Sequence, residues 1–241
     1  MRKTSPAVVT DLAPSGVLRA SINLGNPVLA QGTSAEPSGV TVDIAREIAA
    51  RLGVQVEFAC FTAARHSFEA MMTGKADICF LAIEPAREAQ VAFSAPYVLI
   101  EGVFAVPSQS RLATVDAVDS PGVRIGVKQG SAYDLFLSRT LRSATVVRGM
   151  EGTEEFLTRN LEAAAGIRQP MTEFIAAHPG FRLIEEPFME IRQAVGTAKA
   201  KRPETTRFLH GLVEQLKATG FVADSLLRSG QSAAVAPAAK I

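Results

Sequence analysis

Arg87 is the residue whose type and position most invite a chemical explanation. It follows the apolar run 78–83 and precedes the motif Ser-Ala-Pro-Tyr at 94–97. Its planar guanidinium can make a bidentate, charge-assisted contact with a carboxylate, so Arg87 is a candidate base for a binding site. The alternative is an ordinary exposed arginine at the start of a helix. The elements around Arg87 must decide between the two.

Two further stretches carry polar groups suited to binding. Asn23 and Asn26 lie in the sequence NLGNP, and the turn Gly130-Ser131-Ala132 opens a predicted helix. A helix start offers free backbone N–H groups, which together with a hydroxyl form a ready anion site. Both stretches also have a simpler explanation, because asparagines form turns and serine is a common helix N-cap after a glycine turn.

Other chemistries find little support. Cys60 and Cys79 stand inside apolar runs, which is typical of buried free thiols, and no CxxC or HExxH motif is present. The three histidines stand apart from any partner at metal-ligand spacing. We therefore predict no metal, no cofactor and no catalytic constellation. With 25 basic and 24 acidic residues the net charge is +1, so neither nucleic acid nor an anionic membrane is an expected partner.

The first half of the chain alternates short apolar runs with helix-period segments, as β-α-β units do. Strands are predicted at 17–23, 54–61 and 76–83. A helix is predicted at 43–53, with Asp43 as its cap and Gly53 at its end. A second helix runs through Phe68, Met71 and Met72 and stops at Gly74.

A second unit of similar layout begins near residue 120. Its predicted strands are 123–129, 144–149, 163–167 and 181–186, and its predicted helices are 130–141, 153–162 and one around 171–178. The connections 105–122 and 187–199 join the two units, and an amphipathic helix at 202–220 follows. We expect a discontinuous first lobe (14–106 and 192–230), a second lobe (107–191) and a mobile tail (231–241).

In this layout the candidate residues all lie at or near the carboxyl ends of predicted strands. Ligands of open α/β sheets bind beyond the carboxyl ends of the strands, and clefts between domains are preferred sites. Asn23 is the last residue of one predicted strand, and Arg87 and Ser131 follow the ends of two others. We therefore expect an α/β protein of two lobes, each a mostly parallel sheet flanked by helices, with the ligand cleft between them.

Several motifs resemble the family 3 extracellular solute-binding proteins, the type II periplasmic receptors of ABC transport. GVLRASI with VTVDIAREIAARLGVQVEF resembles the opening of that family. MMTGKADICFLAIEPAREAQVAFSAPY resembles its pattern L-x-x-G-k-x-D-a-i…T-x-x-R…F-S-x-P-Y, and GVRIGVKQGSAYDLF resembles the start of its second lobe. LKATGFVADSLLRSG resembles its C-terminal motif. The resemblance runs from Gly16 to about Gly230.

The resemblance implies roles for individual residues. Arg87 would pair bidentately with the ligand carboxylate, and the backbone of Ala82 would donate to the same group. Ser131 and the N–H of Ala132 would supply the contacts from the second lobe. The following residues would pack near the connection between the lobes: Phe93, Ser94, Pro96 and Tyr97.

The chain departs from the family where an α-ammonium is usually held. The family's acidic residue at the end of a second-lobe strand corresponds to Ile167, which is followed by Arg168. Arg168 could turn into the cleft and repel a cation or pair with an acidic group on the ligand. A shift of a few residues in the alignment would let Glu162 replace the missing acid. The usual aromatic residue near the first strand is also missing, and Glu84 replaces a threonine.

The resemblance implies a monomeric receptor that captures a small carboxylate-bearing solute, an organic acid or an amino-acid-like compound, and delivers it to ABC permease subunits. The alternatives are a cytoplasmic enzyme on the same scaffold, similar to cyclohexadienyl or prephenate dehydratases, and a stand-alone ligand-sensing domain. The enzyme would need a general acid, for which Glu84, Glu101 and Glu162 are the candidates. The family implies a periplasmic location. The stretch after Met1 lacks the apolar core of a signal peptide, which would favour the cytoplasm if the chain were a complete gene product.

Overall fold

The computed structural model describes residues 4–239, so residues 1–3 and the last two residues of the tail lie outside the description. The chain forms two compact units: unit 1 comprises Met1–Leu99 and Arg192–Ile241, and unit 2 comprises Ile100–Ile191. The first boundary, between residues 99 and 100, precedes the expected one at 106 and lies within the strand β6 (Val91–Pro107). Both units mix helices with sheet, which confirms the predicted α/β class.

The sheet of unit 1 has three parallel strands at its core. β1 (Val17–Asn23) pairs in parallel with β4 (Gln55–Phe61) on one side and with β5 (Ile78–Ala82) on the other. β10 (Phe181–Ala198) then pairs antiparallel with β5, with Gln193 opposite Ala82, and β6 lies next to β10. All five residues of β5 are buried, as expected for a strand covered on both faces.

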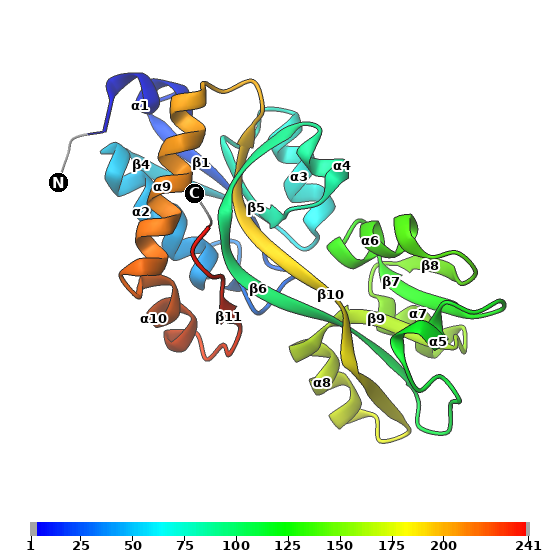
Figure 1. Ribbon diagram of the computed structural model, residues 1–241. Helices are drawn as coiled ribbons and strands as arrows, with labels where there is room; N and C mark the ends of the chain where they lie inside the picture. The colour runs from blue at the N-terminus through cyan, green and yellow to red at the C-terminus, as the bar shows by residue number, and fades with distance from the viewer. Residues whose placement is uncertain (1–3, 240–241) are drawn as a thin grey trace. The chain divides into compact units, whose positions relative to one another are not determined.

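Helices cover both faces of this sheet (Figure 1). α2 (Val40–Leu52), α9 (Pro203–Ala218) and α10 (Phe221–Arg228) gather on one side, and α3 (Ala64–Met72) and α4 (Pro85–Glu88) lie on the other. The remaining elements of unit 1 are α1 (Pro6–Leu12), which was not predicted, and the short strands β2 (Gln31–Gly32), β3 (Pro37–Ser38) and β11 (Ala234–Val235).

The start of α2 differs from the prediction, although its end does not. The N-cap is Gly39 and not Asp43, because residues 40–42 continue the helix toward the N-terminus. The Asp43 carboxylate instead accepts hydrogen bonds from Ser225 Oγ (2.6 Å) and Arg228 Nη2 (3.0 Å), which tie α2 to α10. Gly53 ends the helix in the left-handed conformation (φ 72°), as predicted.

The described part of the tail is held against unit 1, which differs from the expectation of a mobile segment. β11 pairs antiparallel with β6, and Ala236 N donates to Tyr97 O at 3.0 Å. The buried ammonium of Lys217 on α9 donates to Pro96 O of β6 (3.0 Å) and to Pro237 O of the tail (2.8 Å). The extended tail satisfies backbone groups of β6, a tertiary contact that has no periodic signal in the sequence.

Unit 2 repeats the parallel arrangement with β7 (Arg124–Lys128) between β8 (Thr145–Gly149) and β9 (Ala163–Ile167). β6 pairs antiparallel with β9, with Gly102 opposite Ile167. The helices are α5 (Val115–Val118), α6 (Ala132–Thr140), α7 (Gly152–Thr158) and α8 (Arg168–Ala177). Apolar side chains are buried on both faces, as β6 illustrates: Phe104 and Val106 belong to one cluster, Val103 and Ala105 to the other.

The predicted strands match β1, β4, β5, β7, β8 and β9 within two residues at each end. The strand expected at 181–186 extends to Ala198, and β6 was not predicted as a strand. No helix within residues 4–239 has the length and apolar character needed to cross a bilayer.

Candidate functional site

In unit 1 the candidate residues share the carboxyl-end edge of the sheet. Asn23 is the last residue of β1 and Ala82 is the last residue of β5, and the two strands are parallel neighbours. Asn23 Oδ1 accepts from Gly25 N (3.0 Å), and Asn26 Oδ1 accepts from Val28 N (3.2 Å). These side-chain oxygens therefore form the turns that the simpler explanation predicted, which leaves each amide NH₂ group as the part that can donate to a ligand.

Arg87 is buried, with only 3% of its surface exposed, so the alternative of an exposed helix-start residue is wrong. It lies on the short helix α4, directly beyond β5, and its Nη1 donates to Ala82 O at 3.2 Å. Burial lowers the pKa of Arg87 to about 10, while the nearby Cys79 and Glu84 oppose that shift. Burial likewise raises the pKa of the Cys79 thiol to about 12, so Cys79 is a neutral core residue.

A buried guanidinium at the carboxyl-end edge of the sheet can bind an anion. Burial disfavours its charge and the neighbouring Glu84 favours it, and its planar guanidinium can make charge-assisted hydrogen bonds with an anion. The arrangement of Arg87 beside the end of β5 therefore suits a ligand carboxylate.

In unit 2 the turn Gly130-Ser131-Ala132 occupies the equivalent edge. Gly130 adopts a left-handed conformation (φ 71°), and Ser131 is the N-cap of α6, where its Oγ accepts from Asp134 N at 3.1 Å. Ser131 and Ala132 are both buried. Serving as a cap uses one lone pair of the Ser131 hydroxyl and leaves its O–H able to donate.

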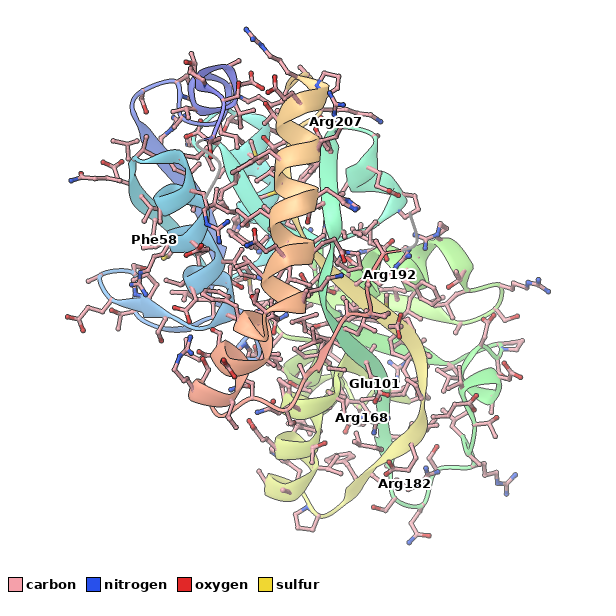
Figure 2. The ribbon with its side chains drawn as sticks, turned by 60° about the vertical axis from the view of Figure 1, so that its left-hand side comes forward. Phe58, Glu101, Arg168, Arg182, Arg192 and Arg207 are labelled. Atoms are coloured by element: carbon pink, nitrogen blue, oxygen red, sulfur yellow. The ribbon has the colours of Figure 1, made fainter. Side chains whose placement is uncertain are left out.

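Arg168 follows Ile167 at the carboxyl end of β9, on the same edge as the turn. Its guanidinium pairs with Glu101, a neighbour that the β6–β9 register provides, and Nη2 donates to Glu185 O at 2.6 Å. Figure 2 labels Arg168 and Glu101, whose side chains lie close together in unit 2. A guanidinium held in this way contacts a ligand only if the ligand competes with these acceptors.

Glu162 lies at the opposite end of β9, directly before Ala163. Its carboxylate accepts from Arg124 N (2.9 Å), Arg124 Nε (2.9 Å) and Arg124 Nη2 (2.9 Å), and these hydrogen bonds lower its pKa. It therefore does not occupy the position at the carboxyl end of β9 that the alignment shift would require.

Within unit 1, the structure brings Arg87 and Ala82 into contact and places Asn23 on their edge. Within unit 2, it places Ser131, Ala132 and Arg168 on one edge. The sequence analysis missed the ion pair between the buried Asp134 and the exposed Arg148, which lies behind the turn with Nε and Oδ1 3.0 Å apart. The spacing Ser131-x-x-Asp134 resembles a capping box and was the available signal. No three His, Cys, Asp or Glu side chains within residues 4–239 gather closely enough to hold a metal ion.

Comparison with known proteins identifies the family of this chain. The family profile of the bacterial extracellular solute-binding proteins, family 3, matches residues 21–228. The chain belongs to this family. No curated protein matches the chain.

Solved structures with the same fold are distant in sequence. A mutant of ArgBP from T. maritima is 22% identical, with a TM-score of 0.74, over 92% of this chain and 99% of that one. An amino acid ABC transporter substrate-binding protein from Streptococcus pneumoniae, bound to L-arginine, is 17% identical, with a TM-score of 0.75, over 95% of this chain and 100% of that one. The ancestral amino acid-binding protein AncCDT-1, a precursor of cyclohexadienyl dehydratase, is 20% identical, with a TM-score of 0.74, over 92% of this chain and 98% of that one.

Proposed function

We propose that the chain is the solute receptor of an ABC-type import system and that it binds its solute through a carboxylate. The observation that carries the proposal is the burial of Arg87 at the carboxyl end of β5. The guanidinium of Arg87 can make charge-assisted, bidentate hydrogen bonds with a carboxylate placed beyond the end of β5. Family membership supports a receptor working outside the cytoplasm with ABC permease subunits.

The proposed solute carries no free α-ammonium at the position usual in the family. Ile167 stands at the end of β9, Arg168 follows it, and Glu162 is engaged with Arg124 at the other end of that strand. An ammonium buried there would lack an acidic partner, at a cost of several kcal/mol. An organic acid or a modified amino acid is therefore the proposed solute class. The L-arginine bound by the Streptococcus pneumoniae protein represents the competing class, a zwitterionic amino acid.

Arg87 of unit 1 and Ser131 of unit 2 are proposed to bind one carboxylate. Binding would then draw the two units together through a hinge in the connecting strands, near residues 105–107 and 190–193. Small-angle scattering with a saturating solute should show a smaller radius of gyration than the free protein, and an unchanged radius would count against closure.

The solute class is tested in two steps. Native mass spectrometry of gently purified protein should reveal a co-purified small acid. A thermal-shift panel then compares succinate and N-acetylated amino acids with glutamine, histidine and arginine. Stabilisation by the acids alone is expected, and tight binding of an ordinary zwitterionic amino acid would overturn the assignment.

Two of the three candidate general acids for the competing dehydratase function are engaged in ion pairs with arginines. Glu162 is ionised by its contacts with Arg124, and Glu101 is paired with Arg168. Glu84 is the third candidate and is buried close to Arg87. An assay for water elimination from prephenate or arogenate distinguishes the two functions, since a receptor should bind without turnover.

A further inference from the structure

In the turn before α6, some backbone N–H groups donate hydrogen bonds to the described part of the protein and others do not. Gln129 N donates to Gly149 O (3.0 Å), and Ser131 N donates to Lys128 O (3.1 Å). Gly130 N donates to the Asp134 carboxylate at 2.8 Å. No described residue accepts a hydrogen bond from the N–H of Ala132 or Tyr133. The turn therefore leaves two successive N–H groups beside the Ser131 hydroxyl, a set that matches a carboxylate.

Asp134 is the side chain that fixes this pattern. Its carboxylate is buried and takes up the Gly130 N–H, while its own N–H is held by Ser131 Oγ. These two hydrogen bonds fasten both sides of the turn to the first turn of α6.

A buried carboxylate so close to an anion site also carries a penalty. A like charge within a few ångströms weakens the binding of a second anion by electrostatic repulsion. Arg148, which projects from the adjacent strand β8, counters this charge, because its Nε contacts both Asp134 oxygens at 3.0 and 3.2 Å. Ser138 links the pair, donating to Asp134 Oδ1 (3.1 Å) and accepting from Arg148 Nη2 (2.6 Å).

We propose that Asp134 and Arg148 are a charge-balanced positioning pair for a carboxylate-binding turn at 130–133. Asp134 holds the turn so that the N–H groups of Ala132 and Tyr133 face the ligand, and Arg148 cancels the negative charge that this support introduces. The inference rests on the proposed function, in which Ser131 and Ala132 contact the solute carboxylate.

The test uses the full ¹⁵N-labelled chain and acetate as the probe, titrated at constant ionic strength. In the wild type, the amide signals of Ala132 and Tyr133 should shift and saturate. Arg148→Met leaves the Asp134 charge unbalanced and should raise the apparent Kd for acetate about tenfold. Arg148→Lys keeps the charge and should stay within about twofold of the wild type.

The double variant Arg148→Met/Asp134→Asn separates charge balance from packing. It removes both charges and keeps a side-chain oxygen for the Gly130 N–H, so acetate binding should return most of the way to the wild-type value. A purely structural role predicts that the double variant binds no better than Arg148→Met. That result, or wild-type binding by Arg148→Met, would overturn the proposal.

Asp119 provides a matched control in the same unit. Its carboxylate accepts from the backbone N–H groups of Arg142, Ser143 and Ala144, away from the turn. Asp119→Asn should lower the stability of the protein and leave acetate binding unchanged. A loss of acetate binding in Asp119→Asn would show that the assay reports stability rather than the site, and would remove support from the pair.

Acetate binding by Ser131→Ala distinguishes failure of the positioning pair from failure of the proposed unit 2 contact. Weaker acetate binding by Ser131→Ala but not by Arg148→Met would keep the binding turn and refute only the positioning pair. Unchanged binding by Ser131→Ala, or no saturable shift at Ala132 and Tyr133 in the wild type, would refute the unit 2 contact and the positioning pair with it.

Discussion

The two units are alike at the amino ends of their strands and different at the carboxyl ends. In unit 1, Arg19 of β1 donates hydrogen bonds from Nε (2.9 Å) and Nη2 (2.7 Å) to the carboxylate of Asp77. Asp77 directly precedes β5. We call this arrangement an arginine–carboxylate clamp. In unit 2, Arg124 of β7 grips Glu162, directly before β9, with the same two nitrogens at 2.9 Å each. In both units the arginine's own backbone N–H donates to the same carboxylate.

At the carboxyl ends this likeness is lost. Unit 1 presents a buried cation, Arg87, whereas unit 2 presents a turn of backbone N–H groups with the hydroxyl of Ser131. The shared arginine–carboxylate clamps join neighbouring strands and so serve the fold. The edge that differs is the one that would meet a ligand, with unit 1 supplying charge and unit 2 supplying dipoles.

The largest expected effect comes from breaking the more buried clamp. Arg19→Met strands the carboxylate of Asp77, which is 4% exposed, and should lower the free energy of unfolding by about 3 kcal/mol. This is the lower end for a broken buried pair, because Arg19 itself is 33% exposed. Urea denaturation measures the loss, and solute affinity of the folded protein should not change.

Arg124→Met is the matched control for that experiment. The geometry of the clamp is the same, but Arg124 and Glu162 are 43% and 38% exposed, so water can solvate the remaining carboxylate. The loss of stability should be clearly smaller than for Arg19→Met. Equal losses would show that burial does not set the strength of these clamps.

Arg87→Met tests the opposite edge and should separate function from stability. The solute affinity should fall by about 1.5–3 kcal/mol, the value of hydrogen bonds to a charged group, as calorimetry would show. Urea denaturation of the unliganded variant separates this loss of affinity from any change in stability that follows when Ala82 O and the buried Glu84 lose their interactions with Arg87.

The lowered pKa of Arg87 predicts how this change in stability depends on pH. Below the folded value of about 10, both the folded and the unfolded chains carry the proton, so the wild type bears the full cost of the buried charge. Any difference in Tm between Arg87→Met and the wild type should therefore be independent of pH across roughly pH 6 to 9. Full solute affinity in this variant would contradict the assignment of Arg87 to the ligand.

The smallest expected effect concerns Glu162. Hydrogen bonds from Arg124 lower the pKa of its carboxyl, so the clamp contributes stability above the usual value of 4.5 and loses it as the pH falls through the folded pKa. Glu162→Gln should lower the Tm by about 1–2 °C at pH 7 and by less as the pH approaches 3. A difference in Tm that does not narrow as the pH is lowered would mean that the ion pair is not its source.

The elements with a local signal were predictable from the sequence. The short apolar runs identify β1, β4, β5, β7, β8 and β9, which fix the carboxyl ends and thereby the places of Asn23, Arg87 and Ser131. The long strands β6 and β10 were missed in large part because they contain prolines (Pro96 and Pro107 in β6, Pro187 in β10). Their mixed polarity is also typical of a connection.

The surroundings of the candidate residues depend on contacts that periodicity does not encode. The burial of Arg87 is set by how α4 returns to β5, and the pairing of Arg168 with Glu101 follows from the register of β6 and β9. Asp134 and Arg148 meet because α6 and β8 are neighbours in space. Each of these contacts joins segments that are distant in the sequence. The place of a candidate residue along its strand was therefore predictable, but the side chain that contacts it was not.

The insertion of unit 2 into unit 1 has a consequence for the order of events during synthesis. Unit 2 is one continuous segment, Ile100–Ile191, whereas β5 of unit 1 pairs with the part of β10 that follows Arg192. On the ribosome, β1, β4 and β5 emerge first but must wait for that partner and for α9 and α10, with the β5 edge open in the meantime. Unit 2, although it is synthesised after the first strands of unit 1, should thus fold first. In nascent chains arrested after residue 191, unit 2 should resist protease while unit 1 is still cleaved.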